Sequence, residues 1–197
     1  MIGKQAKVFS ARSLRKLLAH AGKGRQPDRD RLIVLLSVRA GLRACEVARL
    51  TWGMVLDADG QVATAIDVRG SIAKRGTGRR LPMHPQLRQA LVAWRARQGS
   101  SRRGHDAFIV PSVRGGGAMR PNSIVNWFVA KCREAGLEGC SSHSGRRTFI
   151  TNAARNLHRV GASLRDVQAL AGHRSIETTQ GYIDGDTHAQ RKLVAII

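Results

Sequence analysis

The residues best suited to chemistry lie between Ser141 and Tyr182. Tyr182 is the single tyrosine of the 197-residue chain, so any reaction at a phenol oxygen must use it. A phenol has a pKa of about 10, so at neutral pH it needs a nearby base or cations before it attacks an electrophile. His143, His173 and several arginines precede it in the same stretch. This combination indicates a tyrosine nucleophile supported by cationic side chains.

The cysteines and the apolar runs argue against several other classes of protein. Cys45, Cys132 and Cys140 show no Cys-x-x-Cys spacing, so we expect reduced thiols rather than disulfides or a zinc site. No apolar run approaches the roughly 18 residues of a membrane-spanning helix. The basic N-terminus is not followed by an apolar block, so a secretory signal is not expected. We therefore expect a cytoplasmic protein.

Charge is the strongest feature of the composition. The chain has 34 Lys and Arg against 13 Asp and Glu, which leaves a formal net charge of +21. Such an excess predicts a polyanionic partner, with DNA or RNA favoured over an anionic membrane. A merely solvated basic surface is the alternative, because a GC-rich genome also enriches arginine.

Helical patterns precede and follow the first candidate cation, Arg43. Ser10 is a plausible N-cap for a helix that reaches His20. A second helix, at about residues 28–39, carries the longest apolar run, and Gly41 ends it. A short helix is predicted over residues 43–50. Glu46 would share a face with Arg43 on this helix, either as a support for the guanidinium or as an exposed ion pair.

Short strands and turns are predicted between Thr51 and Pro82. The expected strand positions are Trp52, Val55, Val62, Ile66 and Val68, with a turn at residues 57–60. Gly76-Thr77-Gly78 can form a tight hairpin turn with Lys74 and Arg79 beside its tip. Further helices are predicted at residues 87–98 and 121–136, with a strand at residues 108–110 between them. In the later helix, Val125, Phe128 and Val129 are expected to face inward.

Taken in order, these motifs resemble those of the tyrosine recombinases, or phage-type integrases, from about Ser10 to the C-terminus. The matching residues are Gly41-Leu42-Arg43, Lys74, His143-x-x-Arg146, His173 and Tyr182 nine residues later. The resemblance implies an α+β fold that is mainly α-helical, with a small antiparallel three-stranded sheet. We further expect a basic arm at residues 1–9 and a single catalytic domain at residues 10–197. Larger members of the family carry an N-terminal core-binding domain, and no separate one is expected here, so the chain resembles either a minimal recombinase or the catalytic half of a longer one.

The resemblance also implies the reaction, in which double-stranded DNA is cut and rejoined through a 3′-phosphotyrosine link. Tyr182 would be the nucleophile. Arg43, Arg146 and His173 would stabilise charge on the nonbridging phosphate oxygens, and Glu46 would hold the guanidinium of Arg43 in place. His143 would accept the phenolic proton or hold the phosphate. Neither a metal nor another cofactor is expected.

The proton donor to the leaving oxygen is the least settled role. Lys74 occupies the family's lysine position, but Arg75 replaces the glycine that usually follows it. Because an arginine almost never deprotonates, Lys74 is the favoured donor. The remaining predicted DNA contacts are Arg75, Arg79, Arg80, Arg147 and Arg174.

Two functions other than recombination, and the docking site of the C-terminal tail, stay open. The same chemistry would serve a topoisomerase-like enzyme, and the same fold would serve a non-catalytic DNA-binding relic. We expect a homotetramer on DNA in the nucleoid, with no membrane partner and no small-molecule substrate. The apolar tail at residues 193–197 would dock either on a partner subunit or on its own core.

Overall fold

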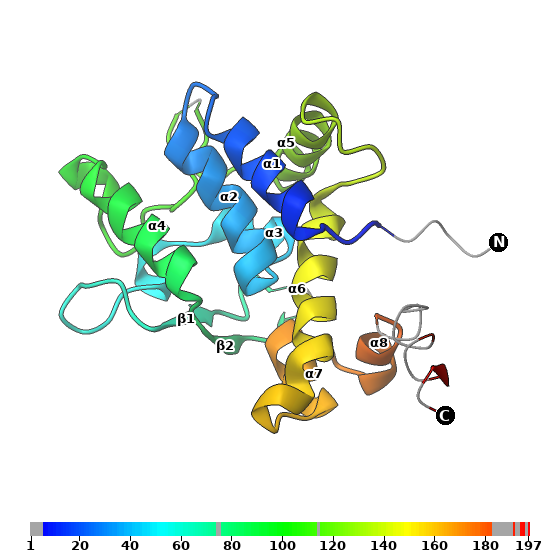
Figure 1. Cartoon of the computed structure of the whole chain (residues 1–197). Coiled ribbons are helices and arrows are strands. Elements are labelled where there is room, and N and C mark those ends of the chain that lie inside the picture. The colour runs from blue at the N-terminus through cyan, green and yellow to red at the C-terminus, as the bar shows by residue number, and fades with distance from the viewer. Residues whose placement is uncertain (1–5, 74–75, 114, 183–190, 192–193, 196) are drawn as a thin grey trace. The chain divides into compact units, whose positions relative to one another are not determined.

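The computed structural model describes residues 6–73, 76–113, 115–182, 191, 194–195 and 197 (Figure 1). Its contacts divide the chain into two compact units, Met1–Phe149 and Ile150–Ile197. The first contains α1 (Ala11–Ala21), α2 (Pro27–Ala40), α3 (Ala44–Arg49), η1 (Trp52–Met54), β1 (Ala65–Val68), β2 (Arg79–Pro82), α4 (Pro85–Ala96), η3 (Ser100–Arg102), α5 (Pro121–Glu134) and the start of α6 (Ser142–Asn156). The second contains the rest of α6, η4 (Leu157–Val160), α7 (Leu164–Ala171) and α8 (Ile176–Gln180).

The core of the first unit is built around α2. Leu32, Ile33, Val34 and Leu36 in this helix have no exposed surface. Five consecutive apolar residues, 32–36, cover every side of the helix at this point, so other elements must surround it, and α1, α3 and α4 all contact α2. No helix among the described residues combines the length and the apolar character needed to cross a membrane.

Most predicted helices are present close to their expected bounds. The Ser10 side chain accepts the N–H of Ser13, which confirms it as the N-cap of α1. In α5 the buried stripe is Ile124, Phe128 and Cys132, each four residues after the last. Val129 is 38% exposed, so its predicted inward position was wrong, because it lies about 100° around the helix from Phe128.

The predicted fold class is confirmed, except that the described residues form a two-stranded sheet instead of a three-stranded one. Strands β1 and β2 pair antiparallel, with Val68 opposite Arg79. The expected third strand reduces to a single bridge, Leu56 to Val62. Two local features shorten it: η1 occupies its start, and the Asp57 carboxylate accepts the N–H groups of Asp59 and Gln61. The strand predicted at residues 108–110 also forms only one bridge, Thr51 to Phe108.

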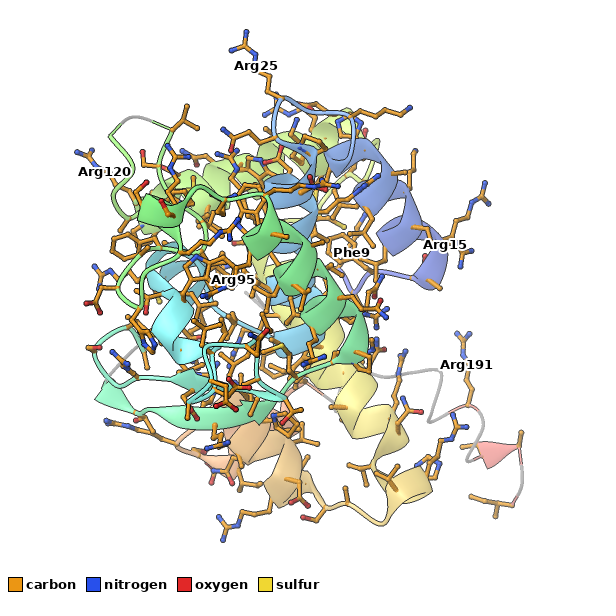
Figure 2. All side chains as sticks on the ribbon, turned by 90° about the vertical axis from the view of Figure 1, so that its left-hand side faces the viewer. Phe9, Arg15, Arg25, Arg95, Arg120 and Arg191 are labelled. Carbon is orange, nitrogen blue, oxygen red and sulfur yellow. The ribbon has the colours of Figure 1, made fainter. Side chains whose placement is uncertain are left out.

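The predicted N-terminal arm lies partly outside the described residues. Its last residue, Phe9, is 4% exposed, and its N–H donates to Thr148 Oγ1 at 2.8 Å. Figure 2 shows Phe9 against the body of the first unit, whereas Arg15, Arg25 and Arg120 point away from it. The division into an arm at residues 1–9 and one domain at residues 10–197 stays a prediction.

Candidate active site

Arg43 sits at the turn between α2 and α3. Gly41 ends α2 with φ at +61°, and a Cβ at this position would lie 2.4 Å from a ring carbon of Phe149. Only glycine fits this combination of a positive φ and a close neighbour. The chain then turns so that Arg43 is the N-cap of α3.

Glu46 binds Arg43 from within the protein. Its side chain has no exposed surface, so the pair is not the exposed ion pair considered above. One carboxylate oxygen accepts the Arg43 backbone N–H at 2.8 Å, and the other accepts the guanidinium at 3.1 Å. The carboxylate therefore contacts both the backbone and the side chain of Arg43.

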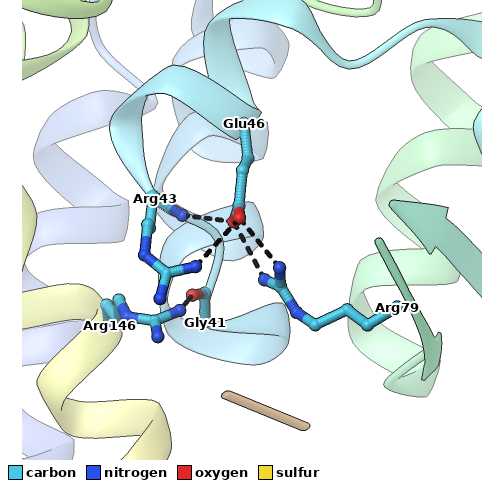
Figure 3. Close-up of polar contacts among 5 residues, drawn as sticks. All are labelled: Gly41, Arg43, Glu46, Arg79 and Arg146. Carbon is cyan, nitrogen blue, oxygen red and sulfur yellow. Dashed lines mark hydrogen bonds and ion pairs between the residues drawn. The ribbon is translucent and has the colours of Figure 1, made fainter. Parts of the chain in front are cut away.

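Arg79 binds the same carboxylate through a bidentate pair. Its Nη1 and Nη2 donate to the two oxygens of Glu46 at 2.8 and 2.9 Å (Figure 3). The Arg79 side chain is only 6% exposed. Burial by itself would raise the pKa of Glu46, but the hydrogen bonds and charge of Arg79, together with Arg43, outweigh it and lower this pKa. Glu46 is thus a carboxylate shared by two guanidinium groups.

Arg146 reaches the same region from α6. It is 5% exposed, and its Nη1 donates to the Gly41 carbonyl oxygen at 2.6 Å. The helix comes close to α2 because residue 145 is glycine, where a Cβ would lie 2.2 Å from Ser37 Oγ. In Figure 3 the guanidinium groups of Arg43, Arg79 and Arg146 gather around Glu46 and Gly41. Such a cationic cluster suits the oxygens of a phosphate.

The other predicted site residues of the first unit lie nearer to solvent. His143 is exposed in the first turn of α6, and Arg147 is half-buried. Arg80 has a 73% exposed side chain that lies 3.8 Å from Asp67. Lys74 and Arg75 lie outside the described residues, so their roles stay predictions.

The second unit places His173 beside Tyr182. Gly172, with φ at +62°, ends α7, and the His173 N–H returns to the Gln168 carbonyl, as in a Schellman turn. His173 Nδ1 lies 2.9 Å from Thr179 Oγ1, which orients the ring. The His173 and Tyr182 rings stack with centroids 5.4 Å apart and planes 25° from parallel. Arg174, the last predicted DNA contact, is exposed.

Three partners of these residues were not predicted from the sequence: the Arg79 pair with Glu46, the Gly41 carbonyl that holds Arg146, and Thr179. The first joins residues 33 positions apart, so no local pattern indicates it. The Arg146 contact with Gly41 also depends on tertiary packing, and no sequence pattern singled out Thr179, six residues after His173. No cluster of three or more His, Cys, Asp or Glu side chains able to hold a metal occurs in the described ranges.

Comparison with known proteins identifies the family of the chain. The model of the phage integrase family matches residues 7–188. Tyrosine recombinase XerD of Mycobacterium tuberculosis is 33% identical over 190 residues, which cover 91% of this chain and 57% of the relative. A putative integrase/recombinase of Sinorhizobium fredii, y4rA, is 32% identical over 168 residues, covering 84% of this chain and 38% of the relative.

Solved structures share the fold. The XerA recombinase matches with a TM-score of 0.75 and 23% identity, covering 97% of this chain and 65% of the other. The XerH recombinase bound to its palindromic difH substrate matches with a TM-score of 0.74 and 20% identity, covering 98% and 54%. The chain thus spans little more than half the length of XerD, and less of the Sinorhizobium relative.

Proposed function

Because the chain belongs to the phage integrase family, we propose that it carries the chemistry of a site-specific DNA recombinase. The observation that supports this most is the buried cationic cluster, in which Glu46 holds Arg43 and the Gly41 carbonyl holds Arg146. Two fixed guanidinium groups suit the nonbridging oxygens of a phosphodiester. The relatives support the same substrate, since XerH is described as bound to difH DNA.

In the proposed reaction the Tyr182 oxygen attacks phosphorus and forms a 3′-phosphotyrosine bond. The bond from phosphorus to the 5′-oxygen breaks, and this oxygen takes a proton from Lys74. His143 accepts the phenolic proton or holds the phosphate. Arg43, Arg146 and His173 stabilise the negative charge that develops on the nonbridging oxygens. Attack by a hydroxyl of another strand reverses the step, because the phosphodiester energy is kept in the tyrosyl link.

The test is a duplex nicked close to the cleavage site, so that the short leaving strand is lost and the covalent intermediate accumulates. The unsubstituted protein should form an adduct that survives a denaturing gel. Tyr182→Phe should form none while its affinity for DNA stays nearly unchanged, because only the nucleophilic oxygen is removed. An adduct with the Phe variant would contradict the assignment of Tyr182.

A second readout separates strand exchange from other uses of the same chemistry. When a foreign duplex with a free 5′-hydroxyl is added, a recombinase joins it to the trapped strand. Relaxation of supercoils without joined products would indicate a topoisomerase instead. Binding without any adduct would indicate a DNA-binding relic. For the recombinase outcome we propose that the protein assembles as a homo-oligomer on double-stranded DNA.

A further inference from the structure

The carboxylate of Glu46 has more cationic partners than it needs to hold Arg43. Each of its two oxygens accepts two hydrogen bonds, one from Arg43 and one from Arg79. The Arg79 bonds are the bidentate ones, and the Arg79 side chain is less exposed than that of Arg43, at 6% against 22%. Arg79 therefore binds both oxygens of Glu46 through its guanidinium, and its side chain is the less exposed of the two.

The second arginine on Glu46 changes how much of the positive charge of Arg43 is cancelled. With Arg43 alone, the buried carboxylate would form a simple ion pair, and the positive charge would be largely cancelled. With Arg79 present, the carboxylate is neutralised by a second guanidinium on its inner side. Glu46, Arg43 and Arg79 together then carry a net positive charge, and Arg43 is the more exposed of the two cations.

The same bonds fix Arg43 in space. Arg79 is the first residue of β2, held opposite Val68 of β1, whereas Glu46 belongs to α3. The bidentate pair thus joins the sheet to the short helix and restricts rotation of the carboxylate. A carboxylate fixed in this way in turn fixes the guanidinium of Arg43.

We propose that Arg79 is a positioning residue for the reaction: through Glu46 it orients Arg43 and keeps its positive charge available to the phosphate. This role rests on the proposed function, and it differs from the DNA contact predicted for Arg79 from the sequence. Arg79 acts on the rate of cleavage more than on DNA affinity, because its guanidinium is directed to a carboxylate inside the protein.

The test compares single-turnover cleavage of two substrates at saturating DNA. One has an ordinary phosphodiester at the cleaved position, and the other has an uncharged methylphosphonate there. Arg79→Met should slow cleavage of the ordinary substrate by about 100-fold, the loss typical of a misplaced catalytic group. On the methylphosphonate the loss should shrink strongly for Arg79→Met and also for Arg43→Ala. One charged nonbridging oxygen is replaced by a methyl group there, so the transition state carries one negative charge fewer for Arg43 to stabilise. Arg79→Lys keeps the positive charge but loses the bidentate pair. Its cleavage rate should fall between that of Arg79→Met and that of the unsubstituted protein.

Arg80 provides the matched control. It is the next residue of β2, it carries the same charge, and its exposed side chain faces Asp67 rather than Glu46. Any loss caused by Arg80→Met should have the same factor on both substrates. A double variant supplies a second check: Arg43→Ala with Arg79→Met should cleave no more slowly than Arg43→Ala alone.

The outcomes separate the inference from the function on which it rests. If Arg79→Met loses the same factor on both substrates, or if the double-variant losses multiply, Arg79 does not act through Arg43 and the inference is overturned. If Arg79→Met does not fold, Arg79→Lys carries the same comparison. If the unsubstituted protein forms no adduct, the proposed function itself fails. If Arg43→Ala loses the same factor on both substrates, the role proposed for Arg43 fails, and the inference about Arg79 fails with it.

Discussion

Glu46 has no exposed side-chain surface in a chain of net charge +21, and its carboxylate accepts four hydrogen bonds from Arg43 and Arg79. A buried charge is tolerated only when it is paired and hydrogen-bonded, and here four bonds satisfy it. Removing this one carboxylate would leave two guanidinium groups without their shared partner. Glu46 should therefore contribute more to stability than one partner of an exposed ion pair on a helix does.

We predict that Glu46→Gln lowers the free energy of unfolding by about 3 kcal/mol at neutral pH, since it breaks a buried ion pair. The folded pKa of Glu46 lies below its ordinary value of 4.5. The stabilisation is therefore full above pH 4.5 and is lost as the pH falls through the folded pKa. Urea denaturation of both proteins from pH 7 to pH 3 measures the difference.

Glu138→Gln is the control for this pH series, because Glu138 is an exposed carboxylate of the same unit. Its stability should differ from that of the parent by no more than about 0.5 kcal/mol. A Glu46→Gln difference that stays constant down to pH 3 would show that the carboxylate charge does not supply the stability.

At the scale of elements, the approach of α6 to α2 positions Arg146. A Cβ on Gly145 would lie 2.8 Å from Ser37 Cβ as well as 2.2 Å from its oxygen, so one of the two helices would have to shift. Such overpacking typically costs about 1–3 kcal/mol. The backbone shift would also move Arg146 relative to its acceptor, the carbonyl of Gly41.

We therefore predict that Gly145→Ala lowers the melting temperature and slows cleavage, even though alanine favours a helix more than glycine does. Gly104→Ala is the control, because a Cβ there meets no atom within 4 Å and its φ is not positive. Thermal unfolding and single-turnover cleavage measure the two effects. A Gly145→Ala protein as stable as the parent would mean that the helices separate without penalty.

Helices and strands were predictable from the sequence where local patterns determine them. The N-cap of α1, the apolar α2 and its stop at Gly41 follow from residues close in the chain. The third strand failed because Asp57 binds turn amides beside it, and side-chain capping of this kind competes with strand pairing. In the site, the pair of Arg43 and Glu46 was predictable from its spacing of three. Arg79 was not, because it lies 33 residues from Glu46 and only tertiary packing joins them.

At the scale of the whole molecule, the charge of +21 determines how the proposed binding to DNA should depend on salt. Exposed arginines such as Arg15, Arg25 and Arg120 extend from the first unit (Figure 2). Each phosphate that such a side chain neutralises releases counterions from the duplex, so affinity falls as salt rises.

We predict a linear fall of log affinity against log salt concentration, with a loss of about 10³–10⁵ between 50 and 200 mM salt. Arg80→Met and Arg174→Met should each make the slope shallower by about 1 if they contact phosphates. Fluorescence anisotropy with a labelled duplex provides the measurement. A flat plot would rule out binding dominated by phosphate contacts.

Substitutions of Gly41 should inactivate the protein although glycine has no reactive group. Its positive φ and its contact with Phe149 exclude a side chain, and its carbonyl oxygen is the acceptor for Arg146. A residue with nothing reactive in it thus controls the placement of a reactive one. A selection for inactive alleles should recover Gly41 substitutions alongside those of Arg43 and Arg146. Second-site suppressors of a Gly41 allele should map to Phe149, where a smaller ring or an aliphatic side chain makes room for the new Cβ.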